Sequence, residues 1–183
     1  MGALTDRRIA LLRGINVGTA KRIAMADLRT LFEALGHTDV RTLLNSGNVV
    51  FTAGKTTASD EETRLEAAIA KRLGVTTRVT VLTGKALAAT VRDNPLLSVA
   101  KDPSRLLIMV LKDAKAAAQL TPLLKESWTR EMVSISSRVA YLWCPDGIAK
   151  SKLWATANRL AGDAGTARNL ATMAKLLALV EKA

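Results

Sequence analysis

The stretch VRTLLNSGNVVFT, residues 40–52, decides the fold of this chain. Two runs of β-branched and aliphatic residues, 40–44 and 49–52, flank the four residues Asn45-Ser46-Gly47-Asn48. A glycine among turn-forming residues between two apolar runs is typical of a β-hairpin. Both runs carry apolar side chains on both faces, so the sequence predicts a sheet that is covered on both sides.

The residues before the hairpin predict a strand, a loop and a helix. Residues 9–12 are a short apolar run, and the chain then passes through Gly14 and Gly18, as expected for a strand that leads into a loop. Residues 25–35 carry apolar side chains at spacings of three and four. This pattern predicts an amphipathic helix that ends near Gly36.

The residues after the hairpin predict another helix and another strand. Residues 60–73 have an acidic first turn, and Ser59 or Asp60 is the expected N-cap of this helix. Residues 76–82 alternate polar and β-branched side chains, as a strand does. The predicted order, strand-helix-strand-strand-helix-strand, is that of the ferredoxin-like unit.

The second half of the chain follows a similar order less clearly. It predicts strands at 105–111, 132–135 and 139–143, and helices at 85–92, 114–125, 148–160 and 168–180, the last capped by Thr166. We therefore predict an α+β fold of two ferredoxin-like (βαββαβ-type) subdomains packed together, with extra C-terminal helices. Residues 1–83 would form the N-terminal subdomain, and residues 84–183 the C-terminal subdomain with two terminal helices.

The composition is that of a globular, basic protein. Hydrophobic residues make up 49% of the chain, charged residues 23%, and the net charge is +11. The charge is spread, with 14 basic and 9 acidic residues up to Ala100 and 13 and 7 after it. This distribution favours a solvated basic surface over a concentrated nucleic-acid footprint, although folding can gather scattered charges onto one face.

The sequence lacks both a membrane-spanning apolar run and a second cysteine, and these two features bear on the cellular compartment. No apolar run approaches the ~18 residues of a membrane span. The single cysteine, Cys144, cannot form an internal disulfide bond. We expect a cytoplasmic protein without a membrane partner.

The segment RGINVG, residues 13–18, is the most distinctive candidate for a binding site. Its glycines allow backbone conformations that other residues avoid, and Arg13, Lys21 and Arg22 supply positive charge. The first two strands of a right-handed βαβ unit are parallel, so this loop and the hairpin turn leave the sheet at the same end. We expect Arg13, Asn16, Gly18 and Lys21 to lie near Ser46, Gly47 and Asn48, as an anion-binding site or as a network that only stiffens the fold.

Catalytic and metal-binding patterns are scarce. The only histidine, His37, follows a predicted helix end and is expected to be an exposed loop residue. Cys144 stands beside a proline at a strand end and is expected to be a small core or turn residue. The sequence offers no Cys/His zinc pattern, and we predict no catalytic residues, no metal site and no cofactor.

Four stretches of the sequence together form a distinctive pattern: LLRGINVG near the N-terminus, VRTLLNSGNVVF, Asn94-Pro95 and Thr166-Ala167-Arg168-Asn169. In these stretches the chain resembles the DUF1697 family of bacterial proteins of unknown function. It implies an α+β fold of ferredoxin-like subdomains and no established activity, substrate or cofactor.

The family's recurring positions correspond to nine residues of this sequence. They are Arg13, Gly14, Asn16, Gly18, Ser46, Gly47, Asn48, Arg168 and Asn169. The chain departs from the family pattern at Asn45, where glutamine is usual, at Thr19, where glycine is usual, and at Leu170, where tryptophan is frequent.

Three classes of function remain open at this point. The favoured one is a non-enzymatic protein that binds an anionic small molecule, a nucleotide or a nucleic acid. The ligand would bind at the edge formed by residues 14–21 and 46–48, with Arg168 as a further charge. The second is a transferase-like enzyme, which the poor supply of general bases disfavours. The third is a structural module that forms a homodimer through an open sheet edge.

Overall fold

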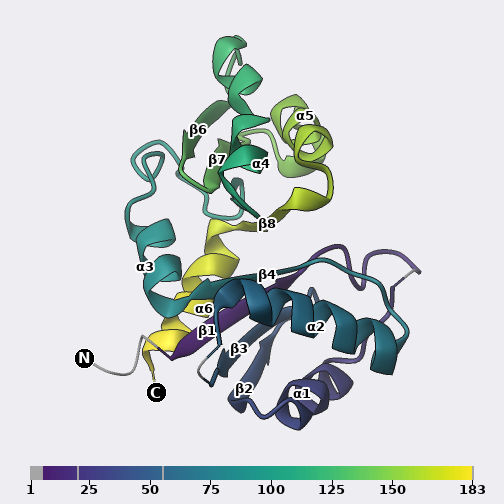
Figure 1. Ribbon diagram of the computed structural model, residues 1–183. Helices are drawn as coiled ribbons and strands as arrows, with labels where there is room; N and C mark the ends of the chain where they lie inside the picture. The colour runs from purple at the N-terminus through teal and green to yellow at the C-terminus, as the bar shows by residue number, and fades with distance from the viewer. Residues whose placement is uncertain (1–5, 20, 55, 183) are drawn as a thin grey trace. The chain divides into compact units, whose positions relative to one another are not determined.

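The computed structural model describes residues 6–19, 21–54 and 56–182 (Figure 1). Its elements follow one another in the order β1 (Arg7–Leu12), α1 (Met25–Ala34), β2 (Thr38–Leu43), β3 (Asn48–Thr52), α2 (Ala58–Leu73), β4 (Val79–Thr83), α3 (Gly84–Arg92), β5 (Leu106–Leu111), α4 (Ala114–Ala118), η1 (Thr121–Lys125), β6 (Met132–Ser136), β7 (Val139–Trp143), η2 (Ile148–Lys150), α5 (Lys152–Ala161), η3 (Gly162–Ala164), β8 (Gly165–Asn169) and α6 (Leu170–Glu181), where η marks a 3-10 helix.

The chain divides into two compact units. The first comprises the described residues of Met1–Ala88 and of Leu176–Ala183, and the second comprises Ala89–Lys175. Each unit contains a four-stranded antiparallel sheet, with strand order β2-β3-β1-β4 in the first and β6-β7-β5-β8 in the second. The two sheets have the same topology, and the predicted fold class of two ferredoxin-like units is confirmed.

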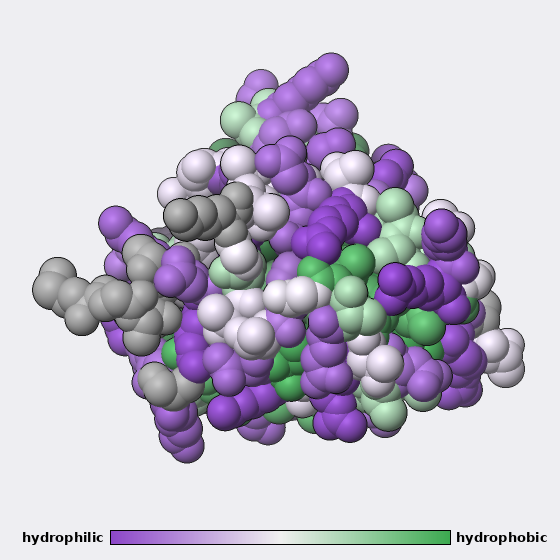
Figure 2. All heavy atoms as spheres, turned by 60° about the horizontal axis from the view of Figure 1, so that its bottom comes forward, coloured by the Kyte–Doolittle hydropathy of each residue, from purple (hydrophilic) through white to green (hydrophobic). Residues whose placement is uncertain are grey.

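The first unit is built around the hairpin that the sequence indicated. β2 and β3 pair with Leu43 opposite Asn48, and β3 also pairs with β1 in the centre of the sheet. α1 and α2 bury their apolar stripes against one face, where Phe32 and Phe51 meet edge to face with ring centroids 5.1 Å apart. Residues on the other face, such as Ile9, are buried as well. The outer surface on the side of α1 is mostly hydrophilic, with hydrophobic atoms in small areas (Figure 2).

The second unit repeats the backbone connections of the first. In each unit two successive backbone N–H groups at the end of the central strand donate hydrogen bonds to backbone carbonyls. The first N–H donates to a carbonyl in the hairpin turn, and the second donates to the carbonyl of the residue before the last strand. The corresponding bonds are Leu12 to Gly47 at 2.8 Å and Arg13 to Arg78 at 2.9 Å in the first unit, and Leu111 to Arg138 at 2.8 Å and Lys112 to Ala164 at 2.8 Å in the second. The fold is therefore an internal repeat of one βαββαβ unit, although the sequence shows no repeat.

The last strand of this repeat corrects the sequence prediction. Residues 165–169 form β8, whereas we predicted a helix from residue 168 with Thr166 as its cap. The strand consists mainly of residues without β propensity and forms because its backbone pairs with β5. Gly165 packs tightly there, since a Cβ atom would lie 3.0 Å from Ala161 Cβ and 3.0 Å from Met109 Sδ. The cap of α6 is Asn169, whose Oδ1 accepts the Thr172 N–H at 2.9 Å.

Two helix boundaries also differ from those predicted. The helix expected at 114–125 stops at Ala118 and continues only as η1, which contains Pro122 near its start. The cap of α2 is Thr57, whose side chain accepts the Asp60 N–H at 3.1 Å. The predicted caps Ser59 and Asp60 both lie inside the helix.

His37 is the clearest error of the sequence prediction. It is buried rather than exposed, and its Nε2 lies 2.8 Å from Oε1 of the fully buried Glu61. Glu61 Oε2 also accepts the Thr56 hydroxyl at 2.7 Å. Burial is the main cause that lowers the pKa of His37, whereas the neighbouring Glu61 carboxylate opposes this shift. The acidic first turn of α2 is therefore only partly a capping feature.

Two further carboxylates of α2, Glu62 and Glu66, protect an edge of the first sheet. β4 is an edge strand, and its outward N–H groups at Val79 and Val81 donate to Glu66 Oε1 at 2.9 Å and Glu62 Oε1 at 2.8 Å. Edge N–H groups that already have partners are poor templates for another strand. This observation disfavours a homodimer formed through β4. None of the helices in the described ranges is long and apolar enough to cross a membrane.

Candidate functional site

The loop after β1 and the hairpin turn are spatial neighbours, as predicted. Both β1 and β2 run antiparallel to β3, so their C-terminal ends lie at the same end of the sheet. The Leu12 N–H donates to the Gly47 carbonyl at 2.8 Å, and Asn16 Nδ2 donates to the Asn45 carbonyl at 2.7 Å. Loop 13–24 and turn 44–47 therefore form one structure, which we call the loop edge.

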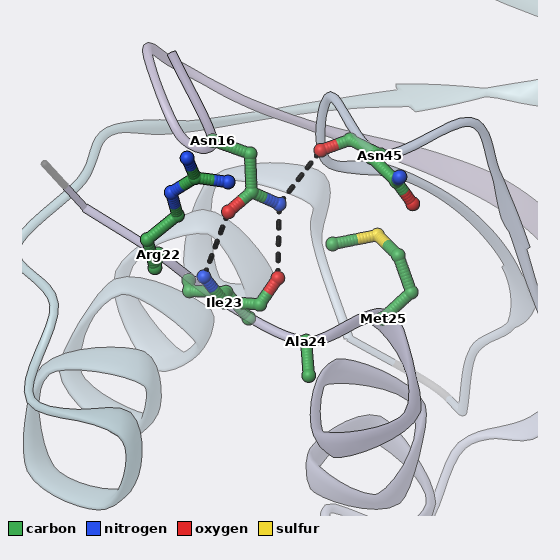
Figure 3. A pocket seen from close by; sticks show the side chains of 6 residues that line it. All are labelled: Asn16, Arg22, Ile23, Ala24, Met25 and Asn45. Atoms are coloured by element: carbon green, nitrogen blue, oxygen red, sulfur yellow. Dashed lines mark hydrogen bonds between the residues drawn. The ribbon is translucent and has the colours of Figure 1, made fainter. Parts of the chain in front are cut away.

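Asn16 is the centre of the loop edge (Figure 3). Its Oδ1 accepts the Ile23 N–H at 2.9 Å, and its Nδ2 donates to the Ile23 carbonyl at 2.9 Å as well as to Asn45. Its backbone has a φ of 54°, a left-handed conformation that asparagine tolerates better than most residues. Both amide hydrogens are used within the protein, so Asn16 holds the loop in place and is not free to donate to a ligand.

Gly47 and Asn48 shape the turn. Asn48 is fully buried, and its Nδ2 donates to the Leu43 carbonyl at 2.9 Å and to Ser46 Oγ at 3.0 Å. Gly47 has a φ of 76°, and a Cβ atom at this position would lie 2.7 Å from Leu12 Cβ and 2.8 Å from Ile15 Cδ1. Like Asn16, these two residues hold the turn and the loop in place through contacts within the protein.

A shallow pocket of about 390 Å³ lies beside Asn16. It is lined by Asn16, Arg22, Ile23, Ala24, Met25 and Asn45. Figure 3 shows Arg22 and Asn45 on opposite sides of the Asn16 amide, with the Met25 side chain extending toward it. The pocket lies at the start of α1, whose N-cap Ala24 provides no side-chain cap. The first backbone N–H groups of a helix are left without intrahelical partners and favour negative charge.

The electrostatics of the loop edge are one-sided. Residues 13–24 and 44–48 contain Arg13, Lys21 and Arg22 but neither aspartate nor glutamate. Lys21 and Arg22 are exposed and Arg13 is half-buried. The nearest acidic residue along the chain is Asp27, in the first turn of α1. Of the six pocket-lining residues, Asn16 was a predicted site residue and Arg22, Ile23, Ala24, Met25 and Asn45 were not; the predicted Arg13 and Lys21 do not line the pocket. Arg22 directly follows Lys21, and this adjacency was the available signal for it.

The other predicted glycines and Ser46 lie where expected. Gly14 and Gly18 have φ values of 62° and 61°, so both glycines meet a conformational requirement of the loop. Ser46 accepts from Asn48 inside the turn. These positions belong to the loop edge, although none of them lines the pocket.

Arg168 and Asn169 do not belong to the loop edge. Both lie on β8 of the second unit. Asn169 caps α6, and Arg168 Nη1 donates to the neighbouring Ala167 carbonyl at 2.8 Å. Both therefore belong to a different unit from the loop and the turn.

The second unit makes the corresponding connection with far fewer residues. β1 and α1 are separated by the twelve residues 13–24, whereas β5 and α4 are separated by only Lys112 and Asp113. The residue in the place of Gly47 is Arg138, whose side-chain Nε donates to the Leu111 carbonyl at 2.9 Å. The same fold thus forms with a two-residue connection, and the longer loop is not needed for the strand-to-helix turn.

In the second unit, Glu131, Ser151 and Cys144 have structural roles or are buried. In the second unit a pocket of about 570 Å³ is lined in part by Glu131 and Ser151. These two cap α5: the Ser151 hydroxyl donates to Glu131 and accepts the Trp154 N–H, and Glu131 Oε2 accepts the Leu153 N–H at 3.2 Å. Cys144 is buried, which raises the pKa of its thiol. Among the described residues no group of three or more His, Cys, Asp or Glu side chains is arranged to hold a metal ion.

Comparison with known proteins agrees with the architecture. The chain is a double ferredoxin-like α+β protein, and residues 5–141 match the family described as "Protein of unknown function (DUF1697)". The chain belongs to this family. A solved structure, that of the conserved bacterial protein SP0830 from Streptococcus pneumoniae, is similar with a TM-score of 0.73 and 20% sequence identity, over 96% of this chain and 98% of that one. No curated protein matches the chain.

Proposed function

We propose that the protein is a binding protein whose loop edge recognises an anionic ligand beside the start of α1. The observation that carries this proposal is the difference between the two units: the same strand-to-helix connection takes two residues in one unit and twelve in the other. The longer connection carries three cations and no acidic residue. A loop that the fold does not require and that bears charge of one sign is better explained by binding than by stability.

The pocket supports this proposal through its lining. Arg22 contributes a guanidinium with several donors in a planar arrangement that suits carboxylate and phosphate oxygens. The N–H groups in the first turn of α1 add partial positive charge. Asn16 and Gly47 hold this surface in one conformation, which reduces the entropy lost on binding.

A pair of matched variants tests the proposal. Lys21→Ala with Arg22→Ala removes two exposed charges from the loop edge. Lys71→Ala with Arg72→Ala removes two adjacent, exposed charges from the last turn of α2 and serves as the control. Inorganic phosphate, ATP and a single-stranded oligonucleotide would be titrated by calorimetry at a fixed salt concentration. Loss of two charge-assisted contacts of about 1.5–3 kcal/mol each should raise Kd by at least about a hundredfold in the first variant.

A third variant changes binding in the opposite direction. Asp27→Asn removes the acidic side chain nearest the pocket along the chain, and anion affinity should rise. If none of the three anions binds the unmodified protein, the proposal is wrong. It is also wrong if both double variants weaken binding equally, because general surface charge and not the loop edge would then be responsible.

A further inference from the structure

Two exposed apolar side chains flank the centre of the loop edge. Val17 is 70% exposed and Leu44 is 54% exposed, the highest values among the exposed large hydrophobic residues of the described chain. Val17 directly follows Asn16, and Leu44 directly precedes Asn45. A hydrogen bond between Asn16 and Asn45 joins the loop to the turn. The hydrogen bond therefore joins the two segments that carry these apolar residues, and each residue is adjacent in sequence to one that lines the pocket.

Leu44 is also in an unfavourable backbone conformation. Its φ is 57°, in the left-handed region where glycine or asparagine is the usual residue and a bulky side chain is uncommon. Asparagine at this position would fit the turn and would expose less apolar surface. A leucine that is both exposed and conformationally disfavoured contributes little to the folded state, so its presence points to an interaction outside the chain.

We propose that the anionic ligand of the loop edge is an acidic segment of a partner protein that also presents an apolar side chain. Carboxylates of the segment would lie against Lys21 and Arg22, and the apolar side chain would lie against Val17 and Leu44. This inference rests on the proposed function. Apolar residues beside arginine, with acidic residues absent from both segments, match the composition of protein interfaces and complement an acidic partner.

The composition favours protein over the two other polyanionic partners. Proteins that bind single-stranded nucleic acid stack bases on aromatic rings, and residues 13–24 and 44–48 contain no aromatic residue. Stable attachment to a lipid surface needs more buried apolar area than two aliphatic side chains offer. A protein segment can use both features of the loop edge at once, since carboxylate and aliphatic side chains alternate freely in a peptide.

The test compares two pools of fluorescent decapeptides by anisotropy. In the first pool Asp or Glu alternates with Leu, Ile or Phe, and in the second serine replaces every apolar residue. The variants are Leu44→Asn with Val17→Ser, Lys21→Ala with Arg22→Ala, and Leu124→Asn as the control, because Leu124 is 53% exposed in the second unit. Leu44→Asn should not unfold the protein, because asparagine accepts the left-handed conformation, and thermal melting verifies this.

The expected result is an apolar preference that depends on the loop edge. The unmodified protein should bind the apolar-containing pool about tenfold more tightly than the serine pool. The Val17 and Leu44 variant should lose this preference and keep its weak affinity for the serine pool, whereas the Lys21 and Arg22 variant should lose affinity for both. The Leu124 control should behave like the unmodified protein.

Other outcomes separate this inference from the proposed function. Equal affinity for both pools, still dependent on Lys21 and Arg22, overturns the inference and leaves the anion site intact. An oligonucleotide that binds more tightly than either peptide pool also overturns the inference and leaves the anion site intact. So does binding of phosphatidylcholine and phosphatidylserine vesicles through Val17 and Leu44 if the peptides do not bind. If the Lys21 and Arg22 variant binds the peptides as tightly as the unmodified protein does, the further inference and the proposed function are both wrong.

Discussion

Substitution of Gly47 by alanine tests whether the turn and the loop are one structure. A Cβ atom at Gly47 would lie 2.7 Å from Leu12 Cβ and 2.8 Å from Ile15 Cδ1, closer than such atoms approach in proteins. The φ of 76° adds a left-handed strain of about 1–2 kcal/mol. Overpacking of a buried contact adds about 1–3 kcal/mol. We expect Gly47→Ala to lower the free energy of unfolding by about 2–5 kcal/mol.

Gly18→Ala is the matched control. Gly18 has a φ of 61°, but no heavy atom lies within 4 Å of the position of an added Cβ. Only the conformational part of the cost, about 1–2 kcal/mol, should therefore appear in this variant. The difference between the two variants isolates the contact of Gly47 with Leu12 and Ile15, which belong to the end of β1 and to the loop.

Urea unfolding followed by far-ultraviolet circular dichroism measures both variants. With an m-value of about 1–3 kcal/mol per molar urea, the midpoint for Gly47→Ala should lie roughly 1 M below that for Gly18→Ala. Because Ile15 must move to admit the new methyl group, anion binding at the loop edge should also weaken in Gly47→Ala. Equal midpoints for the two alanine variants would show that the turn does not pack against the loop as the structure indicates.

Three further predictions concern side chains that hold the first unit together. Asn16→Gly keeps the left-handed backbone but loses three hydrogen bonds, and should lower the free energy of unfolding by about 2–4 kcal/mol in urea titrations. Because the pKa of His37 is lowered in the folded protein, the unfolded chain binds a proton at this residue more readily than the folded protein does. The contribution of His37 to the free energy of unfolding should therefore be constant above pH 6.5 and fall as the pH decreases below it. In His37→Gln this part of the pH dependence should disappear. Glu62→Ala with Glu66→Ala frees two N–H groups of β4, and light scattering should then detect more concentration-dependent association than for the unmodified protein.

The parts of the fold that could be predicted are those in which local pattern and tertiary packing agree. The hairpin at 40–52 has a turn sequence and two apolar runs, and the structure places Leu43 opposite Asn48 as the turn requires. The meeting of loop and turn also followed from topology alone, because β1 and β2 must be parallel in a βαβ unit. Neither result needed any information about side-chain contacts.

The parts that could not be predicted depend on contacts between distant residues. β8 has little β propensity, and it forms because β5 offers an open edge to its backbone. His37 follows a helix end, where exposure is usual, and it is buried because Glu61 from α2 supplies a hydrogen-bond partner. The role of Asn169 as a cap was hidden for the same reason, since the position of a cap depends on where the preceding strand ends.

Within the loop edge, the residues that hold the structure differ from those available for binding. Asn16, Gly47 and Asn48 are engaged by hydrogen bonds or close contacts inside the protein, so changes there should reduce stability and binding together. Lys21 and Arg22 are exposed, and their loss should reduce binding without a matching loss of stability. If the Lys21 and Arg22 variant instead melted well below the unmodified protein, the two charges would be part of the scaffold. The loop edge would then be a structural feature of the first unit, and the reason for its length would have to be sought in folding.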